Sequence, residues 1–249
     1  MKKILLIAVS LFVFQFLAAQ ENVPDPKKNI VKINIPDLVI RNYSLQYERV
    51  LNKTISLAVA YRFMPEGTTP MKNIILDYVD DQDAIDAINE AQLSNFAVTP
   101  EIRFYLGKKG FGRGAYISIF YRYANFDLRN VNYDFENDEE AINASVGFDG
   151  NIKSNTVGFV IGHQWSLGRH LCLDLWLLGP HVGLCKTNVN GIPSEPLDQE
   201  QQDLVRDKLN DFDSDPYDKT VSVSSNKVSM NLDGPFGGFR AGFSFGIKF

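Results

Sequence analysis

The sequence predicts an all-β fold: an eight-stranded antiparallel up-and-down transmembrane β-barrel with short helices in its long extracellular loops. Three observations lead to this prediction. Many segments alternate between apolar and small or polar residues, the connections between them alternate in length, and acidic residues gather in the long connections. Alternation with a period of two indicates a strand. Short turns at one rim and long loops at the other favour a closed up-and-down arrangement.

The first element is a predicted signal peptide at residues 1–19. Lys2 and Lys3 precede an apolar run, and Ala18-Ala19 supplies small residues for cleavage. The run is shorter than the roughly 20 apolar residues that a spanning helix needs. An uncleaved membrane anchor is the alternative. Cleavage would leave residues 20–249 as one exported β-barrel domain with 23 basic and 30 acidic residues, a net charge of −7.

The eight predicted strands share one pattern, which is clearest in the final segment RAGFSFGIKF (240–249). There the bulky apolar residues Phe243, Phe245, Ile247 and Phe249 alternate with small or charged ones. In a membrane barrel such a bulky face meets lipid, and the other face lines the interior. In a soluble sandwich it would meet a second sheet. The other strands are predicted near residues 29–36, 40–51, 54–63, 95–106, 115–126, 156–167 and 171–178.

The connections between these strands are sorted by length and by charge. Short ones are 52–53, 107–114 and 168–170, and long ones are 64–94, 127–152 and 187–226. Only the tip near 36–40 is short where a long loop is expected. The long connections hold 23 acidic and 5 basic residues, a net charge of −18, whereas the remainder after residue 19 carries +11. One rim is therefore predicted to be strongly acidic.

This combination of features resembles the small outer-membrane β-barrel proteins of Gram-negative bacteria. The segment SLQYERVLNKTISLAVAYRF (44–63) is similar to the opening hairpin of a sub-family of unestablished function. The resemblance implies a multi-pass outer-membrane protein of the cell envelope, in contact with membrane lipid and lipopolysaccharide. It also implies that the barrel-assembly machinery is a partner. The residues that would carry the signal for that machinery are Phe243, Phe245, Ile247 and Phe249.

Charged residues are predicted inside the barrel, because they lie opposite the bulky apolar positions of their strands. They are Lys32, Glu48, Arg62, Glu101, Arg103, Arg122, Asp174 and Arg240. An eight-stranded barrel is just wide enough for side chains to fill it, and charges held away from water must be paired. The sequence leaves two interpretations: a lumen filled by paired side chains, or a narrow porin-like channel. The excess of cations would make that channel favour anions.

The long loops suggest helices and a cation site. Apolar residues at helical spacing predict helices near 80–93 and 194–212, with Ser194 as a cap. These helices either dock an unknown extracellular partner or pack on the barrel mouth. The carboxylates of Asp211, Asp213, Asp215 and Asp218 suggest loosely bound calcium. However, Pro216 and Ser222 replace the Gly and Glu of an EF-hand loop, so a solvated acidic loop is the alternative.

Other functions have less support. No Ser or Asp is tied by a motif to His163, His170 or His181, so we expect no enzyme and no tightly bound cofactor. An acidic exported chain does not favour nucleic-acid binding. The sequence therefore predicts a structural or surface-interaction protein of the outer membrane with a filled lumen. A channel or uptake component is the alternative, and a soluble lipocalin-like binder is less favoured, because its bulky apolar residues would lie inside.

Overall fold

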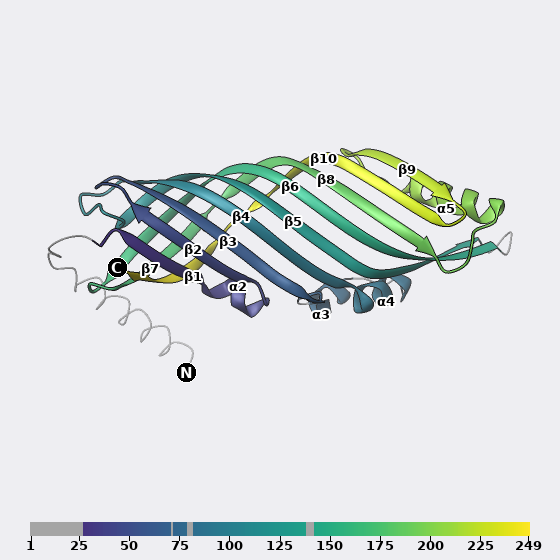
Figure 1. Cartoon of the computed structure of the whole chain (residues 1–249), viewed down its shortest axis with the longest axis horizontal. Coiled ribbons are helices and arrows are strands. Elements are labelled where there is room, and N and C mark those ends of the chain that lie inside the picture. The colour runs from purple at the N-terminus through teal and green to yellow at the C-terminus, as the bar shows by residue number, and fades with distance from the viewer. Residues whose placement is uncertain (1–26, 71, 79–81, 138–141) are drawn as a thin grey trace.

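The computed structural model describes residues 27–70, 72–78, 82–137 and 142–249 (Figure 1). The expected signal peptide, residues 1–19, lies outside this part of the chain. In chain order the elements are β1 (Asn29–Asn34), α2 (Ile35–Val39), β2 (Tyr43–Val50), β3 (Ile55–Thr68), α3 (Lys72–Leu76), α4 (Gln82–Glu90), β4 (Gln92–Tyr105), β5 (Gly114–Asn137), β6 (Ile142–Leu167), β7 (Leu171–Leu178), β8 (Pro180–Pro193), α5 (Gln199–Asp211), β9 (Asp218–Ser224), β10 (Lys227–Phe239) and β11 (Gly242–Lys248).

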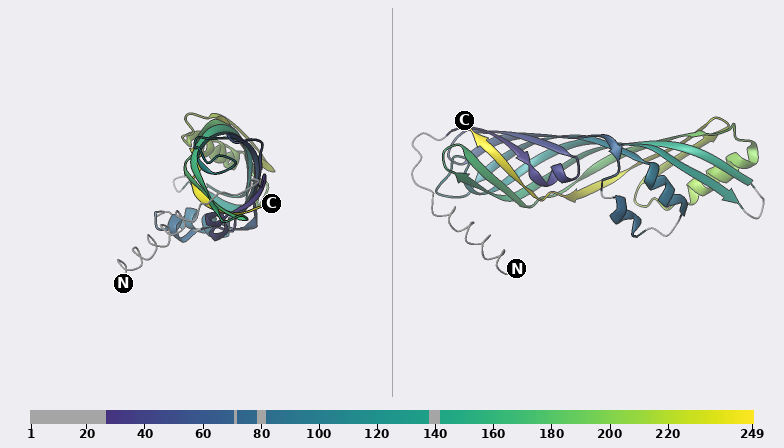
Figure 2. Two further views of the ribbon diagram at one scale, coloured as in Figure 1. Left: turned by 90° about the vertical axis from the view of Figure 1, so that its left-hand side faces the viewer. Right: turned by 90° about the horizontal axis from the view of Figure 1, so that it is seen from below.

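The strands form one antiparallel sheet of 11 strands, in which β1 to β6 pair in sequence order. The far part of β6 pairs with β7, β7 with β11, and β11 returns to β1. These eight strands therefore pair in a ring, which Figure 2 shows end-on. The ring is partial in length: it does not extend along the whole of the longer strands, because β1 has only 6 residues and β2 only 8. It closes along the part of the molecule next to the short turns.

Beyond the ring the sheet stays open and continues as β5, β6, β8, β10 and β9 (Figure 1). The sequence predicted eight strands, and the structure has 11 for three reasons. β8 is an additional strand that follows the predicted strand 171–178, which is β7, and β10 is an additional strand that precedes the predicted strand 240–249, which contains β11. β9 is an additional strand within the predicted loop 187–226. The predicted loop 127–152 is mostly strand, since β5 reaches Asn137 and β6 begins at Ile142.

The two faces of the ring differ in polarity, and the bulky apolar face is the outer one. In β2, Ser44, Gln46 and Glu48 are buried, and Gln46 and Glu48 contact Arg103 and Lys32 inside the ring, whereas Leu45 and Tyr47 are exposed. The same alternation holds in β11 and much of β3 and β5. An apolar exterior around a charged interior is the reverse of an ordinary water-soluble domain.

The phase of this alternation changes where β7 passes into β8. Leu177 and Leu178 are consecutive residues and both are exposed. The pairing of β6 with β7 also shifts register at this place, which indicates a bulge. The bulge turns His181 to the inside, although strict alternation from Trp176 would place it outside.

Inside the ring the side chains lie in layers. Nearest the short turns, Ile30, Val50 and Cys172 form an apolar cluster against which Phe111 packs. Farther along is a mainly aromatic cluster that contains Tyr105, Tyr116, Phe120, Val160 and Trp176. Buried side chains therefore occupy the interior of the ring at the level of these two clusters.

The helices connect or cover the sheet. α5 begins with a capping box between Asp198 and Gln201, so the predicted cap at Ser194 was wrong and the helix is shorter than 194–212. Val205 of α5 is fully buried in a third apolar cluster with residues of β5, β6 and β10. This helix therefore packs its apolar side on the sheet, which is one of the two alternatives predicted for it. Among the described residues, no helix combines the length and the apolar composition needed to cross a membrane.

Candidate functional site

Six charged residues meet inside the ring, and we call them the ionic cluster. β1 supplies Lys32, β2 supplies Glu48, β7 supplies Asp174, β4 supplies Glu101 and Arg103, and Arg240 lies between β10 and β11. Each side chain is at most 8% exposed. The strands that carry them are far apart in the sequence and are brought together only when the ring forms.

Lys32 and Arg103 are the centres of the cluster. The Nζ of Lys32 lies 2.5 Å from Oε2 of Glu48 and 2.7 Å from Oδ2 of Asp174. The Nη1 of Arg103 lies 2.6 Å from the same Asp174 oxygen and 3.3 Å from the same Glu48 oxygen. The Nε of Arg103 donates to Glu101 Oε1 at 2.7 Å. Both cations therefore bridge two strands or more.

Neutral side chains complete the cluster. Glu48 Oε1 accepts hydrogen bonds from Ser56 Oγ at 2.6 Å and from Tyr105 OH at 2.7 Å. The hydroxyl of Tyr116 donates to Asp174 Oδ1 at 2.8 Å. Arg240 is the outermost member, with its Nη1 4.0 Å from Glu101 Oε2. Three cations and three anions meet, so the cluster has no net formal charge.

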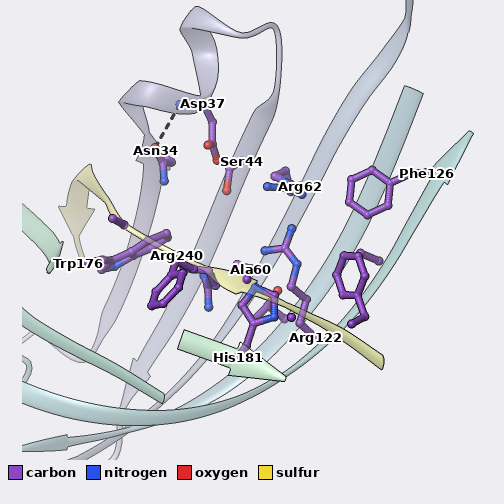
Figure 3. A pocket seen from close by; sticks show the side chains of 17 residues that line it. Asn34, Asp37, Ser44, Ala60, Arg62, Arg122, Phe126, Trp176, His181 and Arg240 are labelled. Carbon is purple, nitrogen blue, oxygen red and sulfur yellow. Dashed lines mark hydrogen bonds between the residues drawn. The ribbon is translucent and has the colours of Figure 1, made fainter. Parts of the chain in front are cut away.

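A cavity of about 340 Å³ lies next to Arg240, the outermost member of the cluster (Figure 3). Arg62 from β3, Arg122 from β5, His181 from β8 and Arg240 approach it from different strands. Aromatic side chains form much of the remaining wall: Phe126, Trp176, Phe236 and Phe239. The cavity therefore combines a cationic part with an aromatic part.

Several polar atoms on this wall have no hydrogen-bond partner among the described residues. They are Nε of Arg62, Nε1 of Trp176, Nδ1 of His181 and Nη1 of Arg240. In addition, the guanidinium group of Arg122, a residue that is 9% exposed, makes no hydrogen bond or ion pair within the described residues. Buried donors without acceptors are rare in folded proteins, and each needs an explanation.

Asp37 is the carboxylate of the cavity wall. It lies in α2, where its backbone N–H donates to the N-cap side chain Asn34 Oδ1 at 3.3 Å. Burial raises the pKa of Asp37, while the charge of Arg62 and a hydrogen bond with Ser44 oppose that rise. One carboxylate therefore faces three arginines across the cavity.

The eight predicted lumen residues thus occupy two different places. The structure joins Lys32, Glu48, Glu101, Arg103, Asp174 and Arg240 in the ionic cluster. Arg62 and Arg122 lie apart from it, on the wall of the cavity. The proposed assembly residues Phe243, Phe245, Ile247 and Phe249 are all exposed on the outer face at the end of the chain.

The acidic loop does not form a compact cation site. Asp211 ends α5 and Asp218 begins β9, with Asp213 and Asp215 between them. Among the described residues, no three His, Cys, Asp or Glu side chains lie close enough together to hold a metal ion. The calcium hypothesis therefore gains no support from the geometry.

Asp37, Trp176 and His181 are among the residues of the cavity that the sequence did not single out. Sequence patterns indicate no role for Asp37 beyond its place in the tip near 36–40, and they tie His181 to no motif. Trp176 is two residues after Asp174 and therefore lies on the same face of the strand, so the alternation pattern was sufficient to predict its inward position. The position of His181 depends on the bulge, which alternation does not reveal.

Comparisons with known proteins give a family but no activity. A family model described as a protein of unknown function, DUF3575, matches residues 4–190. The search of the curated proteins found no match to this sequence.

Proposed function

The chain belongs to the DUF3575 family, whose function is unknown, and we propose that it is an integral outer-membrane β-barrel protein whose lumen is filled by its own side chains. Its role is structural or surface-interacting, and the long acidic connections face the outside of the cell. The buried ionic cluster is the observation that carries this proposal. Lys32 and Arg103 hold carboxylates of three strands across the interior at 2.5–3.3 Å, and the apolar layer of Ile30 and Val50 lies below them.

The outer face of the ring supports a membrane location. Bulky residues such as Leu57, Ile119 and Phe245 are exposed on different strands. A large exposed apolar surface marks an interaction site or a membrane contact, and transmembrane barrels carry such a band around a polar interior. A soluble lipocalin-like binder needs the opposite arrangement, with apolar residues inside, and the buried charges disfavour it.

A narrow anion-favouring channel is the second candidate, and the excess of Arg62 and Arg122 in the outer half of the lumen favours it. A channel would need a path past the ionic cluster and the aromatic layer. The short ion-pair distances of Lys32 and Arg103 argue against such a path without rearrangement.

The test begins with the full chain expressed in a Gram-negative host and recovered from separated membrane fractions. We expect it in the outer membrane, with an N-terminus at residue 20 and a heat-modifiable electrophoretic band that reports a folded barrel. Purified protein is then inserted into planar bilayers, with and without millimolar calcium. The filled-lumen proposal expects no single-channel conductance. Steady anion-selective conductance from heat-modifiable protein would support the channel instead, and recovery in a soluble fraction would overturn both.

A further inference from the structure

The cavity carries more positive charge than its surroundings neutralise. The ionic cluster balances itself, because its three cations face three carboxylates. Arg62 and Arg122 remain outside that balance, and Asp37 is the one carboxylate that the described part of the chain contributes to the cavity wall. Two guanidinium groups directed to one buried place are costly unless an anion accompanies them.

The hydrogen-bonding capacity of the wall leads to the same conclusion. Arg62, Arg240 and Trp176 line the cavity, and each has a buried donor atom that has no hydrogen-bond partner among the described residues. Arginine offers several N–H groups in a fixed fork that fits two oxygens of a phosphate or carboxylate group. Three arginines from three places in the sheet surround one small space, as Figure 3 shows.

The other part of the wall would suit a planar apolar group. Trp176, Phe126 and Phe236 line it, and the guanidinium carbon of Arg240 lies 4.8 Å from the ring centre of Trp176. A cavity of about 340 Å³ is at the small end of the range for binding sites. Arg62 and His181 are only partly buried, so the cavity is reached from solvent.

We propose that this cavity binds a small solute that carries a phosphate or carboxylate group next to a planar ring. The arginines hold the anionic group, and the aromatic side chains hold the ring. Lipid headgroups outside the ring are separated from the cavity by the sheet, so the solute comes from the aqueous side. This inference goes beyond the proposed function, since binding in the cavity requires neither conduction nor a loop partner.

Fluorescence of Trp176 provides the measurement, because this side chain lines the cavity. The chain has two tryptophans, and Trp165→Phe leaves Trp176 as the reporter. Folded protein in neutral detergent is titrated at constant ionic strength with three probes: inorganic phosphate, phenyl phosphate and benzyl alcohol. We expect saturable signals from both phosphates, with phenyl phosphate at least tenfold tighter because its ring buries apolar area. Benzyl alcohol should show no saturable signal.

Variants locate the site. Arg62→Gln and Arg122→Gln should each weaken phenyl phosphate binding at least tenfold, because each removes a charged hydrogen-bond donor. The matched control is Arg129→Gln, whose side chain is 57% exposed on β5, and it should bind like the parent. Asp37→Asn keeps all arginines and removes the competing carboxylate, so it should bind several-fold tighter even if the arginine variants fail to fold.

The inference would be overturned by the absence of saturable binding in heat-modifiable protein, which would mean that water alone satisfies the donors. The inference would also be overturned if Arg129→Gln weakened binding as much as Arg62→Gln and Arg122→Gln do. Unchanged binding in Asp37→Asn and in both of those arginine variants would overturn it as well. None of these results depends on conductance, so this proposal and the filled-lumen proposal fail separately.

Discussion

Arg103 and Arg122 project into the same ring from the neighbouring strands β4 and β5, but their surroundings are opposite. Arg103 contacts Glu48, Glu101 and Asp174 within 3.3 Å. Arg122 has no ion pair among the described residues and faces a cavity together with two further arginines. One residue type therefore has two roles in adjacent layers of one lumen.

The difference shows how a buried charge is to be interpreted. A charge that is fully paired and hydrogen-bonded holds strands in register, and breaking such a pair is strongly destabilising. A buried donor without a partner brings no such benefit. Sites where buried polar groups lack hydrogen-bond partners are often functional sites, and other parts of the fold offset the stability that they cost. The ionic cluster holds the ring together, and the cavity beside it is the place to look for a ligand.

The largest effect is expected from matched substitutions of these two arginines. Arg103→Gln should reduce the free energy of unfolding by about 3–5 kcal/mol, because it removes the close cation of buried Glu101 and one of the two cations at Glu48 and Asp174. Arg122→Gln should change it by less than about 1 kcal/mol, since no pair is broken. Urea unfolding of the folded protein in lipid vesicles, followed by the heat-modifiable band, measures both.

Arg129→Gln serves as the control, because its exposed pair with Glu66 at 3.7 Å should contribute almost nothing. Equal losses in Arg103→Gln and Arg122→Gln would show that the two layers do not differ as described. A loss of unfolding free energy in Arg122→Gln but not in Arg103→Gln would mean that Arg122, and not Arg103, is the arginine that stabilises the ring.

Much of this arrangement was contained in the sequence. Alternation with a period of two places Lys32, Glu48 and Asp174 on inward faces, and it does so from local residues alone. Which of them meet was not predictable, because it depends on the register of β1, β2, β4 and β7. Those strands are brought together by pairings between distant parts of the chain. Periodicity fixes the face of a residue but not its partner across the ring.

The misjudged parts have physical causes as well. The predicted loop 127–152 is rich in acidic and amide residues, which are unfavourable in strands, but β5 and β6 continue to pair there as far as Asn137 and Ile142. Pairing along a long hairpin outweighs the weak local preference. His181 was misplaced because the bulge between β7 and β8 changes the phase of alternation. The cavity could not be predicted, since it depends on both features.

Arg240 lies between the two layers, and an intermediate effect is expected from its substitution. Its guanidinium carbon is 4.5 Å from the ring centre of Phe120, and its only ion pair among the described residues is the one to Glu101 at 4.0 Å. Arg240→Gln should cost about 1–2 kcal/mol, mostly through the lost cation–π contacts. Arg240→Lys keeps the charge but not the planar group, so it should recover only part of the loss. A cost as large as that of Arg103→Gln would place Arg240 fully within the ionic cluster.

The smallest effect concerns the carboxylate of the cavity and the pH dependence of stability. Burial raises the pKa of Asp37 above its ordinary value of 3.8. An acid whose pKa is raised in the folded state contributes stability when protonated, and that contribution is lost as pH rises through the folded pKa. Asp37→Asn does not titrate at this position. Its advantage over the wild type should therefore be absent below pH 3.8, appear as pH rises above that value, and then stay constant.

Unfolding curves of both proteins at matched ionic strength, collected in steps from pH 3 to pH 7, measure this difference directly. The other titrating groups are the same in both proteins, so the difference reports the titration of Asp37, including its attraction to Arg62, Arg122 and Arg240. An advantage that shrinks as pH rises would mean that attraction by Arg62 exceeds the cost of burying the carboxylate. In that case Asp37 would already neutralise the arginines, the cavity would resemble the ionic cluster, and the contrast between the two layers would no longer hold.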